Sequence, residues 1–370
     1  MLYGLNMSEP IFVTRAVVPD FQEYSGYLEQ IFAARRMTND GACLRRLERE
    51  LADFLRVPHV ALCSNGSTAL QIALHAAGMA GKRIATTPFS YVATTSALLW
   101  TGCAPVFIDI DEETLCMDPA KLAAALDADA DIRGLLPVHI YGNICDVEAI
   151  DTLARKAGVP VVYDAAQGFG SEYLDTSVPA HGDFAVCSFH ATKVFHTGEG
   201  GAVIVRTAEQ LQAVHLLRAG GHIDDTHIRL GINAKLSELH AALGLCLLKK
   251  TRDNIAGRKA VSAFYDALLP ERGLRRPKFR PGLAHNHAYY PVIFESEPTM
   301  LRVMYALRRE KIFPRRYFFP ALNTLPYLPL RDQPCPTAES VARRVLCLPL
   351  YAELEESAVK KIAGIINGIV

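Results

Sequence analysis

The sequence predicts an α/β protein with a large, mostly parallel β-sheet domain followed by a small C-terminal α/β domain. Short apolar runs alternate with helical periodicity through the first two thirds of the chain, a pattern typical of a parallel sheet. From about residue 255 the pattern changes to antiparallel-looking strands and helices, and 370 residues exceed one typical domain. We therefore expect an N-terminal arm at 1–20, a large domain at 21–254 and a small domain at 255–370.

Apolar spacing predicts the individual elements. The second helix shows this spacing most clearly, because leucines recur along it at positions 44, 47, 51 and 55. We expect helices at 21–35, 42–55, 69–77, 92–100, 118–126, 147–157 and 208–219, with strands at 59–63, 83–87, 105–111, 135–139 and 160–164. A long helix is expected from Gly231 to about Ala267, followed by a strand at 287–294 and helices at 299–310, 338–346 and 358–369.

The charge balance argues against a nucleic-acid partner. Lysine plus arginine and aspartate plus glutamate number 39 each. The distribution is uneven, because residues 251–370 hold 19 Lys/Arg against 11 Asp/Glu, whereas residues 1–250 hold 20 against 28. The basic C-terminal part fits either an anionic ligand such as a sugar-nucleotide pyrophosphate or an ordinary charged surface.

The nine cysteines include no C-x-x-C pair, and most lie in apolar runs. Such a set indicates reduced, buried thiols and a cytoplasmic protein. We find no signal-peptide pattern and no apolar run of membrane-spanning length, so no membrane association is expected. No H-E-x-x-H spacing occurs and no metal is expected, and no G-x-G-x-x-G follows the first strand, which argues against a dinucleotide-binding dehydrogenase.

One lysine stands between two strand-like runs. Lys193 follows an apolar run that ends at Cys187 and precedes the glycine-rich turn Gly198–Gly201. Burial lowers a lysine pKa, and the neutral amine is a nucleophile that forms Schiff bases with carbonyls, including the aldehyde of pyridoxal phosphate (PLP). The alternative is a surface lysine in a hairpin turn.

A carboxylate ends an earlier apolar run. Pro160-Val-Val-Tyr-Asp164 reads as a buried parallel strand that delivers Asp164 at its carboxyl end, where open α/β sheets bind ligands. PLP needs a carboxylate beside its pyridine nitrogen, because the protonated ring is the electron sink. Asp164 precedes Lys193 by 29 residues, and together they point to a PLP site.

A phosphate site is predicted after the strand 59–63. That strand runs into a turn of small polar residues, 64–68, and then into a helix, so backbone N–H groups and the helix dipole face a ligand. Ser67 and Thr68 add hydroxyl donors. The alternative is that Ser67 or Thr68 only caps the helix.

These motifs resemble the DegT/DnrJ/EryC1/StrS family of PLP-dependent aminotransferases of nucleotide-sugar biosynthesis. The resemblance rests on YDAAQGFG at 163–170 and SFHATKVFHTGEGGAVIV at 188–205, and extends from about Asn39 through SNGSTALQIAL and GINAKLSELHAALGL to the terminal CLPLY. It implies PLP fold type I, the aspartate aminotransferase-like fold. It also implies a homodimer with shared active sites.

The resemblance assigns further residues. It implies that Tyr91 stacks on the cofactor ring, that Gln167 bonds the phenolic oxygen, that Ser188 helps hold the phosphate and that Asn233 reaches the partner's site. The alternatives are that Tyr91 or Phe89 packs in the core and that Asn233 caps a helix. Candidate substrate contacts are His190, Lys235 where most relatives have Arg, and Arg316 with Tyr317 in an arginine- and aromatic-rich segment that would hold a sugar or nucleotide.

The implied reaction is ping-pong transamination with Lys193 and Asp164 as the catalytic residues. L-glutamate would supply an amino group to a nucleotide-linked keto-deoxysugar, with C4 of a dTDP-4-keto-6-deoxyhexose favoured, as in deoxyaminosugar biosynthesis for a lipopolysaccharide O-antigen. The alternatives are a C3-aminating relative and a non-catalytic PLP-binding regulator. Some relatives are sugar dehydratases that replace the lysine by histidine, and Lys193 argues against that activity.

Overall fold

The computed structural model describes residues 9–329 and 333–370. Two groups of strands form its centre, the four-stranded β2-β10-β9-β6 and the three-stranded β4-β3-β5. The bridges Leu135–Val161 and Val138–Asp164 join them into one seven-stranded sheet, parallel except for β10. Their bounds are β2 His59–Cys63, β3 Arg83–Thr86, β4 Ala104–Phe107, β5 Ile132–Leu136, β6 Val162–Asp164, β9 Phe184–Ser188 and β10 Gly201–Val205. The predicted α/β class with a large, mostly parallel sheet is confirmed.

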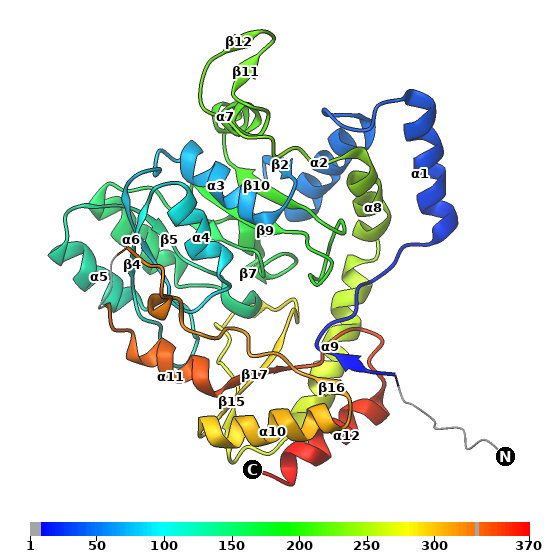
Figure 1. Cartoon of the computed structure of the whole chain (residues 1–370), viewed down its shortest axis with the longest axis vertical. Helices are drawn as coiled ribbons and strands as arrows, with labels where there is room; N and C mark the ends of the chain where they lie inside the picture. The colour runs from blue at the N-terminus through cyan, green and yellow to red at the C-terminus, as the bar shows by residue number, and fades with distance from the viewer. Residues whose placement is uncertain (1–8, 330–332) are drawn as a thin grey trace.

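Helices cover the sheet, as expected from the alternating pattern (Figure 1). Leu44, Leu47, Leu51 and Leu55 are buried along one face of α2, where apolar spacing predicted them. That face packs against α8 and β2, so helical periodicity identified a core helix. The helices of this part are α1 Phe21–Ala34, α2 Ala42–Leu55, α3 Gly66–Ala76, α4 Ala93–Trp100, α5 Pro119–Ala128, α6 Val147–Ala157 and α7 Ala208–Arg218.

The predicted long helix after Gly231 is wrong. Residues 231–237 are not helical, and two helices follow, α8 Glu238–Leu248 and α9 Thr251–Leu268. Ser237 caps α8 by accepting a hydrogen bond from the N–H of His240. The helix therefore starts at Glu238, seven residues after the predicted start at Gly231. The buried carboxylate of Glu238 then accepts the N–H groups of Cys43 and Leu44 at the start of α2.

The C-terminal part contains an antiparallel three-stranded sheet in the order β13-β15-β17. Figure 1 shows α9 running from α8 down to this part, where α10 and α12 lie at the bottom of the view. The element bounds are β13 Leu274–Arg275, β15 Tyr290–Phe294, β16 Ile312–Phe313, β17 Val345–Leu348, α10 Glu297–Arg309, α11 Pro336–Arg344 and α12 Glu356–Asn367. The helix expected at 338–346 ends at Arg344, because the chain turns directly into β17.

The described part of the N-terminal segment lies against the C-terminal part. Its strand β1, Ile11–Phe12, pairs in parallel with β16, and the carbonyl of Val13 accepts the N–H of Leu350 at 3.0 Å. Residues 1–8 of the arm predicted at 1–20 lie outside the described residues.

Two segments project from the body in Figure 1. Helix α1 stands to one side, and a two-stranded hairpin, β11 His222–Ile223 with β12 Thr226–His227, stands at the top. A small antiparallel sheet in the order β14-β7-β8 contains β7 Glu172–Tyr173, β8 Thr176–Ser177 and β14 Leu283–Ala284. Within residues 9–329 and 333–370, none of the helices is long and apolar enough to cross a membrane.

Candidate active site

A cavity of about 620 Å³ opens where several strands of the central sheet end. The chain leaves β2, β6 and β9 beside it, at the carboxyl ends where α/β sheets bind ligands. It brings together nine of the predicted site residues, namely Ser67, Thr68, Tyr91, Asp164, Gln167, Ser188, His190, Lys193 and Tyr317. Asn233, Lys235 and Arg316 are not among the residues that line it.

One end of the cavity is the first turn of α3. Asn65 caps this helix by accepting the N–H of Thr68 at 2.9 Å, so the alternative that Ser67 or Thr68 is the cap is wrong. The N–H groups of Gly66 and Ser67 have no acceptor within the helix. A Cβ atom on Gly66 would lie 3.0 Å from Cβ of Ser188, so glycine keeps the space open there. Backbone donors and hydroxyl groups at a helix N-terminus fit a phosphate group.

Asp164 lies on the floor of the cavity. Its side chain is 4% exposed; Oδ2 accepts the hydroxyl proton of Thr94 at 2.7 Å, and Oδ1 accepts the N–H of Ala166 at 3.1 Å. Burial raises the pKa of this carboxyl, although both hydrogen bonds and the positive charge of Lys193 act in the opposite direction. A buried carboxylate of this kind fits the protonated ring nitrogen of PLP.

Lys193 is half-buried, and its Nζ donates to the hydroxyl of Tyr289 at 3.1 Å. The same Nζ lies 5.7 Å from the centroid of the Tyr289 ring. The backbone N–H of Lys193 bonds to the carbonyl of His190, which fixes the turn. The lysine therefore points into the cavity, and the alternative of an exposed hairpin lysine does not hold.

Gln167 is held by a neighbouring loop. Its Oε1 accepts the backbone N–H of Tyr141 at 2.6 Å, and the side-chain amide of Asn286 donates to the Gln167 carbonyl at 2.8 Å. With Oε1 engaged, the Gln167 NH₂ group is a donor, as a contact to a phenolic oxygen requires.

The aromatic wall of the cavity consists of Tyr91, Tyr289, Tyr317 and Phe318. Of the two rings near residue 90, one packs in the core and the other lines the cavity. Phe89 is fully buried and meets the rings of Tyr141 and Phe318 edge-on, so it packs in the core. Tyr91 lines the cavity and remains 57% exposed, with its ring centroid 6.4 Å from that of Phe318. Tyr91 is therefore the ring available to a planar ligand.

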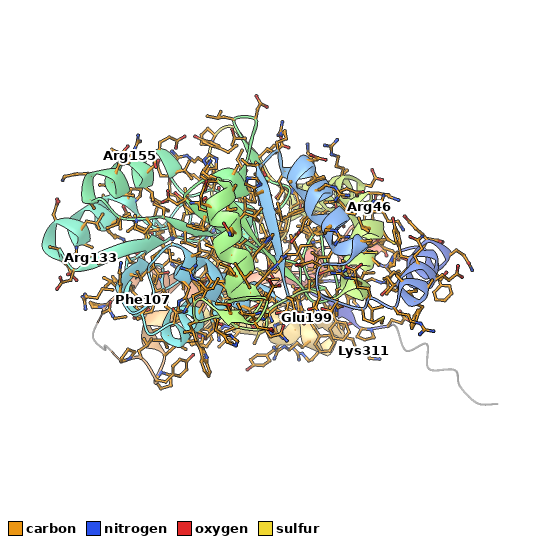
Figure 2. The ribbon with its side chains drawn as sticks, turned by 90° about the horizontal axis from the view of Figure 1, so that it is seen from above. Arg46, Phe107, Arg133, Arg155, Glu199 and Lys311 are labelled. Carbon is orange, nitrogen blue, oxygen red and sulfur yellow. The ribbon has the colours of Figure 1, made fainter. Side chains whose placement is uncertain are left out.

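His190 lies on the rim of the cavity. Its Nδ1 lies 2.8 Å from Oγ1 of Thr192, and its Nε2 lies 3.6 Å from Oε1 of Glu199. In the view of Figure 2, the Glu199 label lies near the centre of the outline, whereas Arg133 and Arg155 lie on the left. His190 is therefore a polar rim residue that is open to solvent.

The two adjacent arginines have different surroundings from those predicted. Arg316 binds Oε1 of Glu297 at 2.8 Å, and its guanidinium stacks on the ring of Phe319 at 3.6 Å. Arg315 lines the cavity instead, with its guanidinium 5.5 Å from the Tyr317 ring. The backbone N–H of Arg315 donates to the carbonyl of Cys347, and the N–H of Cys347 donates to the carbonyl of Arg315. Arg315, and not the predicted Arg316, is therefore the arginine that lines the cavity.

Asn233 and Lys235 lie outside the cavity. Nζ of Lys235 donates to Oδ1 of Asn233 at 3.0 Å, and Asn233 is exposed. The alternative that Asn233 caps a helix is wrong, because Ser237 is the cap. Lys235 forms a backbone bridge with Cys63 at the end of β2, so the pair lies close to the start of the phosphate turn but faces outward.

Four residues beside the predicted set were not singled out from the sequence: Thr94, Tyr289, Glu199 and Arg315. Thr94 lies in the first turn of α4, and its buried hydroxyl faces Asp164, which is 70 positions later in the chain. Tyr289 comes from the C-terminal part, 96 residues from Lys193, and no local pattern connects them. Within the described ranges, no group of three or more His, Cys, Asp or Glu residues is placed to hold a metal ion.

Comparison with known proteins gives consistent results. The model of the DegT/DnrJ/EryC1/StrS aminotransferase family matches residues 21–367. The chain is 38% identical to a dTDP-4-amino-4,6-dideoxy-D-glucose transaminase of Shigella dysenteriae, across 98% of this chain and 100% of that protein. It is 34% identical to a protein of the same description from Escherichia coli, across 96% and 98%. The structure of DesI with its TDP-sugar product superimposes with a TM-score of 0.91 at 29% identity, covering 97% of this chain and 92% of that one.

Proposed function

This chain belongs to the DegT/DnrJ/EryC1/StrS family of PLP-dependent nucleotide-sugar aminotransferases, and we propose that it moves an amino group from L-glutamate to C4 of a dTDP-linked 4-keto-6-deoxyhexose. The observation that carries the proposal is the convergence of Lys193, Asp164 and the start of α3 on one cavity. An amine, a buried carboxylate and a helix N-terminus that can bind phosphate are the three groups that this cofactor requires.

Each of these residues has a distinct task. When bound, PLP supplies an electron sink for the bond-breaking step at the amino-acid carbon. Lys193 would hold the cofactor through its amine, and as a free amine it would be the base that moves a proton from the donor carbon. Asp164 would keep the ring nitrogen protonated, and Ser67, Thr68 and Ser188 would bind the phosphate. The Gln167 amide would donate to the phenolic oxygen, and Tyr91 would stack on the ring.

The substrate assignment rests on the relatives and on the cavity mouth. Two relatives that are aligned over nearly the whole chain carry the description of dTDP-4-amino-4,6-dideoxy-D-glucose transaminase. At the mouth, Arg315 offers a guanidinium and Tyr317 an aromatic ring, and these groups suit the charged and planar parts of a nucleotide diphosphate. His190, beside Glu199 on the rim, suits a sugar hydroxyl.

We also propose that the active protein is a homodimer. Apolar side chains are exposed on the two projecting segments, with Phe21 74% and Phe32 62% exposed on α1 and Leu230 76% exposed after the hairpin. Such a surface needs a partner of matching shape, and a second copy of the chain supplies one. Asn233 is exposed, lies three positions after Leu230 and bonds Lys235, which supports a role for both at the partner's site.

The cysteines support a cytoplasmic location. All nine are free and buried. Burial raises the pKa of the Cys63, Cys187 and Cys347 thiols well above the ordinary value, so they stay protonated and unreactive. A reducing compartment suits a chain with this many unpaired thiols.

A two-stage experiment tests the proposal. The purified protein is loaded with PLP, and its visible spectrum is recorded before and after addition of L-glutamate. Conversion to the pyridoxamine form is expected; a spectrum that is indifferent to L-glutamate and to other amino donors would refute the transaminase. The aminated protein is then mixed with dTDP-4-keto-6-deoxyglucose, and the product is identified by mass spectrometry and NMR. Amination at C3, or of a UDP- or GDP-linked sugar only, would refute the substrate assignment alone.

A further inference from the structure

The five-residue stretch His285–Tyr289 connects the C-terminal part to both Gln167 and Lys193. Asn286 is fully buried, and its side-chain amide donates to the carbonyls of Gln167 and Phe169, both at 2.8 Å. The Asn286 Oδ1 accepts the N–H of Ala288 at 3.0 Å. These bonds fix the backbone immediately before Tyr289.

The ring of Tyr289 is also held in place. It is 7% exposed, and its centroid lies 5.6 Å from that of Tyr141 and 5.7 Å from that of Tyr317. A ring packed between two others has little freedom to rotate. Its hydroxyl therefore presents a fixed acceptor, which Nζ of Lys193 meets at 3.1 Å.

Asp164 is the competing partner for the Lys193 amine. Both side chains line one cavity, and the positive charge of Lys193 lowers the pKa of the Asp164 carboxyl. Across the described residues, however, no ion pair within 4.0 Å joins them, and the amine bonds to Tyr289 instead. The hydroxyl thus draws the amine toward the aromatic wall and leaves Asp164 free to face a ligand.

We propose that Tyr289 is a positioning residue that holds the ε-amine of Lys193 whenever this amine is not bonded to the cofactor. The inference rests on the proposed function only for its role in turnover. A free lysine side chain has four rotatable bonds and about 2 kcal/mol of rotamer entropy, so a fixed acceptor restricts where its nitrogen lies. Positioning of a reacting group within about 1 Å strongly affects rate, so the hydroxyl serves both covalent attachment of PLP and the later proton transfer.

The test compares Tyr289→Phe with the matched control Tyr265→Phe in the full-length chain stripped of cofactor. Both substitutions remove a tyrosine hydroxyl that makes one hydrogen bond of 3.1 Å, but only Tyr289 bonds Lys193, whereas Tyr265 donates to the carbonyl of Pro349 and does not line the cavity. The rate of covalent PLP attachment is followed by absorbance, and attachment at Lys193 is verified by borohydride trapping and mass spectrometry. The affinity for inorganic phosphate, measured by calorimetry, shows whether the predicted phosphate site at the start of α3 is unchanged in each variant.

We expect Tyr289→Phe to slow attachment about fivefold to tenfold, the effect of one lost hydrogen bond, with phosphate affinity and melting temperature unchanged. Tyr265→Phe should attach PLP at the wild-type rate, because its hydroxyl does not contact Lys193. Equal rates for all three proteins, or equal slowing in both variants, would overturn the proposal. Because attachment precedes any amino transfer, this result is independent of whether the wild-type protein proves to be a transaminase.

Discussion

Thr94 donates its hydroxyl proton to Oδ2 of Asp164 over 2.7 Å, in a pair that is almost entirely buried. Thr94 Oγ1 also lies 2.8 Å from Oγ of Ser90, so a short chain of hydroxyl groups ends on the carboxylate. This bond acts against burial, which raises the pKa of Asp164. Thr94 therefore favours the ionised carboxylate that a protonated cofactor ring requires.

Replacement of Thr94 by valine keeps the side-chain shape and removes that bond. We expect about a tenfold loss in kcat/KM for the L-glutamate half-reaction, the effect of one hydrogen bond to a charged group. Single-turnover absorbance measurements check it. Thr95→Val is the matched control, because the buried hydroxyl of Thr95 has no hydrogen-bond partner among the described residues and its loss should not slow the reaction. Equal effects of the two substitutions would contradict the role of Thr94.

Asp164→Asn should separate stability from activity. Because burial raises the pKa of Asp164 above its ordinary value of 3.8, the folded cofactor-free chain binds this proton more tightly than the unfolded chain. Its stability therefore falls as pH rises from 3.8 through the raised pKa. Asparagine removes that cost, so the cofactor-free variant should melt no lower than wild type at pH 8, whereas turnover should fall about 10²- to 10³-fold. Calorimetry and kinetics check both; retained turnover would contradict the role of Asp164.

The adjacent arginines provide a matched pair. Arg315→Gln should raise KM for the nucleotide sugar about tenfold, because a guanidinium at the cavity mouth is lost. Arg316→Gln breaks the bond to Glu297 outside the cavity, so it should lower the melting temperature slightly with KM unchanged. Steady-state kinetics and thermal melts of both variants check this; a raised KM for Arg316→Gln alone would reverse the assignment.

Shared active sites can be tested by complementation. Lys193→Ala and Asn233→Ala homodimers should each be inactive or nearly so. If Asn233 serves the partner's site, a mixed dimer holds one doubly altered site and one intact site. Random re-association makes about half of the dimers mixed, so about a quarter of wild-type activity should be restored. Activity is measured after the two proteins are unfolded and refolded together. Failure to gain activity, with mixed dimers present by native mass spectrometry, would show that each site is built from one chain.

A buried histidine should make the protein acid-sensitive. His139 is fully buried and stacks on Tyr163 at 4.4 Å, and burial lowers its pKa from 6.5 to about 3. The unfolded chain takes up this proton first, so the stability that comes from neutral His139 is present above pH 6.5 and is lost as pH falls. Linkage predicts a loss of about 2 kcal/mol at pH 5.

Urea unfolding at pH 7.5 and pH 5.0 checks the His139 prediction. His139→Asn should lose about 2 kcal/mol less than wild type between these pH values, whatever its absolute stability. His227→Asn, an exposed position on the hairpin, should lose as much as wild type. If His139→Asn and wild type lose the same, then His139 is not the source of the acid sensitivity.

The cofactor site could be predicted from sequence largely because its parts lie at ends of predicted elements. Asp164 ends an apolar strand, and the turn before α3 follows another strand directly. In a parallel sheet such ends meet at one edge, so local patterns that are far apart in the chain converge without any knowledge of packing. The family resemblance then added Gln167 and Ser188, which line the same cavity.

Helix caps and the arginine pair were poorly predicted, because each depends on a choice between neighbouring residues. Asn65 caps α3 although Ser67 and Thr68 are also good capping residues, and Ser237 rather than Asn233 caps α8. Arg315 lines the cavity and Arg316 does not, because the backbone of Arg315 pairs with Cys347 and successive side chains of an extended segment point to opposite sides. Composition and periodicity do not encode such one-residue differences.

The sequence by itself determined the fold class, the family and the central pair of Lys193 and Asp164, because strand periodicity and the residues at strand ends are local properties. Tertiary structure alone decided which groups surround that pair. Tyr289 reaches Lys193 from 96 positions away, and Thr94 reaches Asp164 from 70 positions away. The physical reason is that hydrogen bonds between side chains depend on packing of separate elements to within a few tenths of an ångström, which no pattern within a single element specifies.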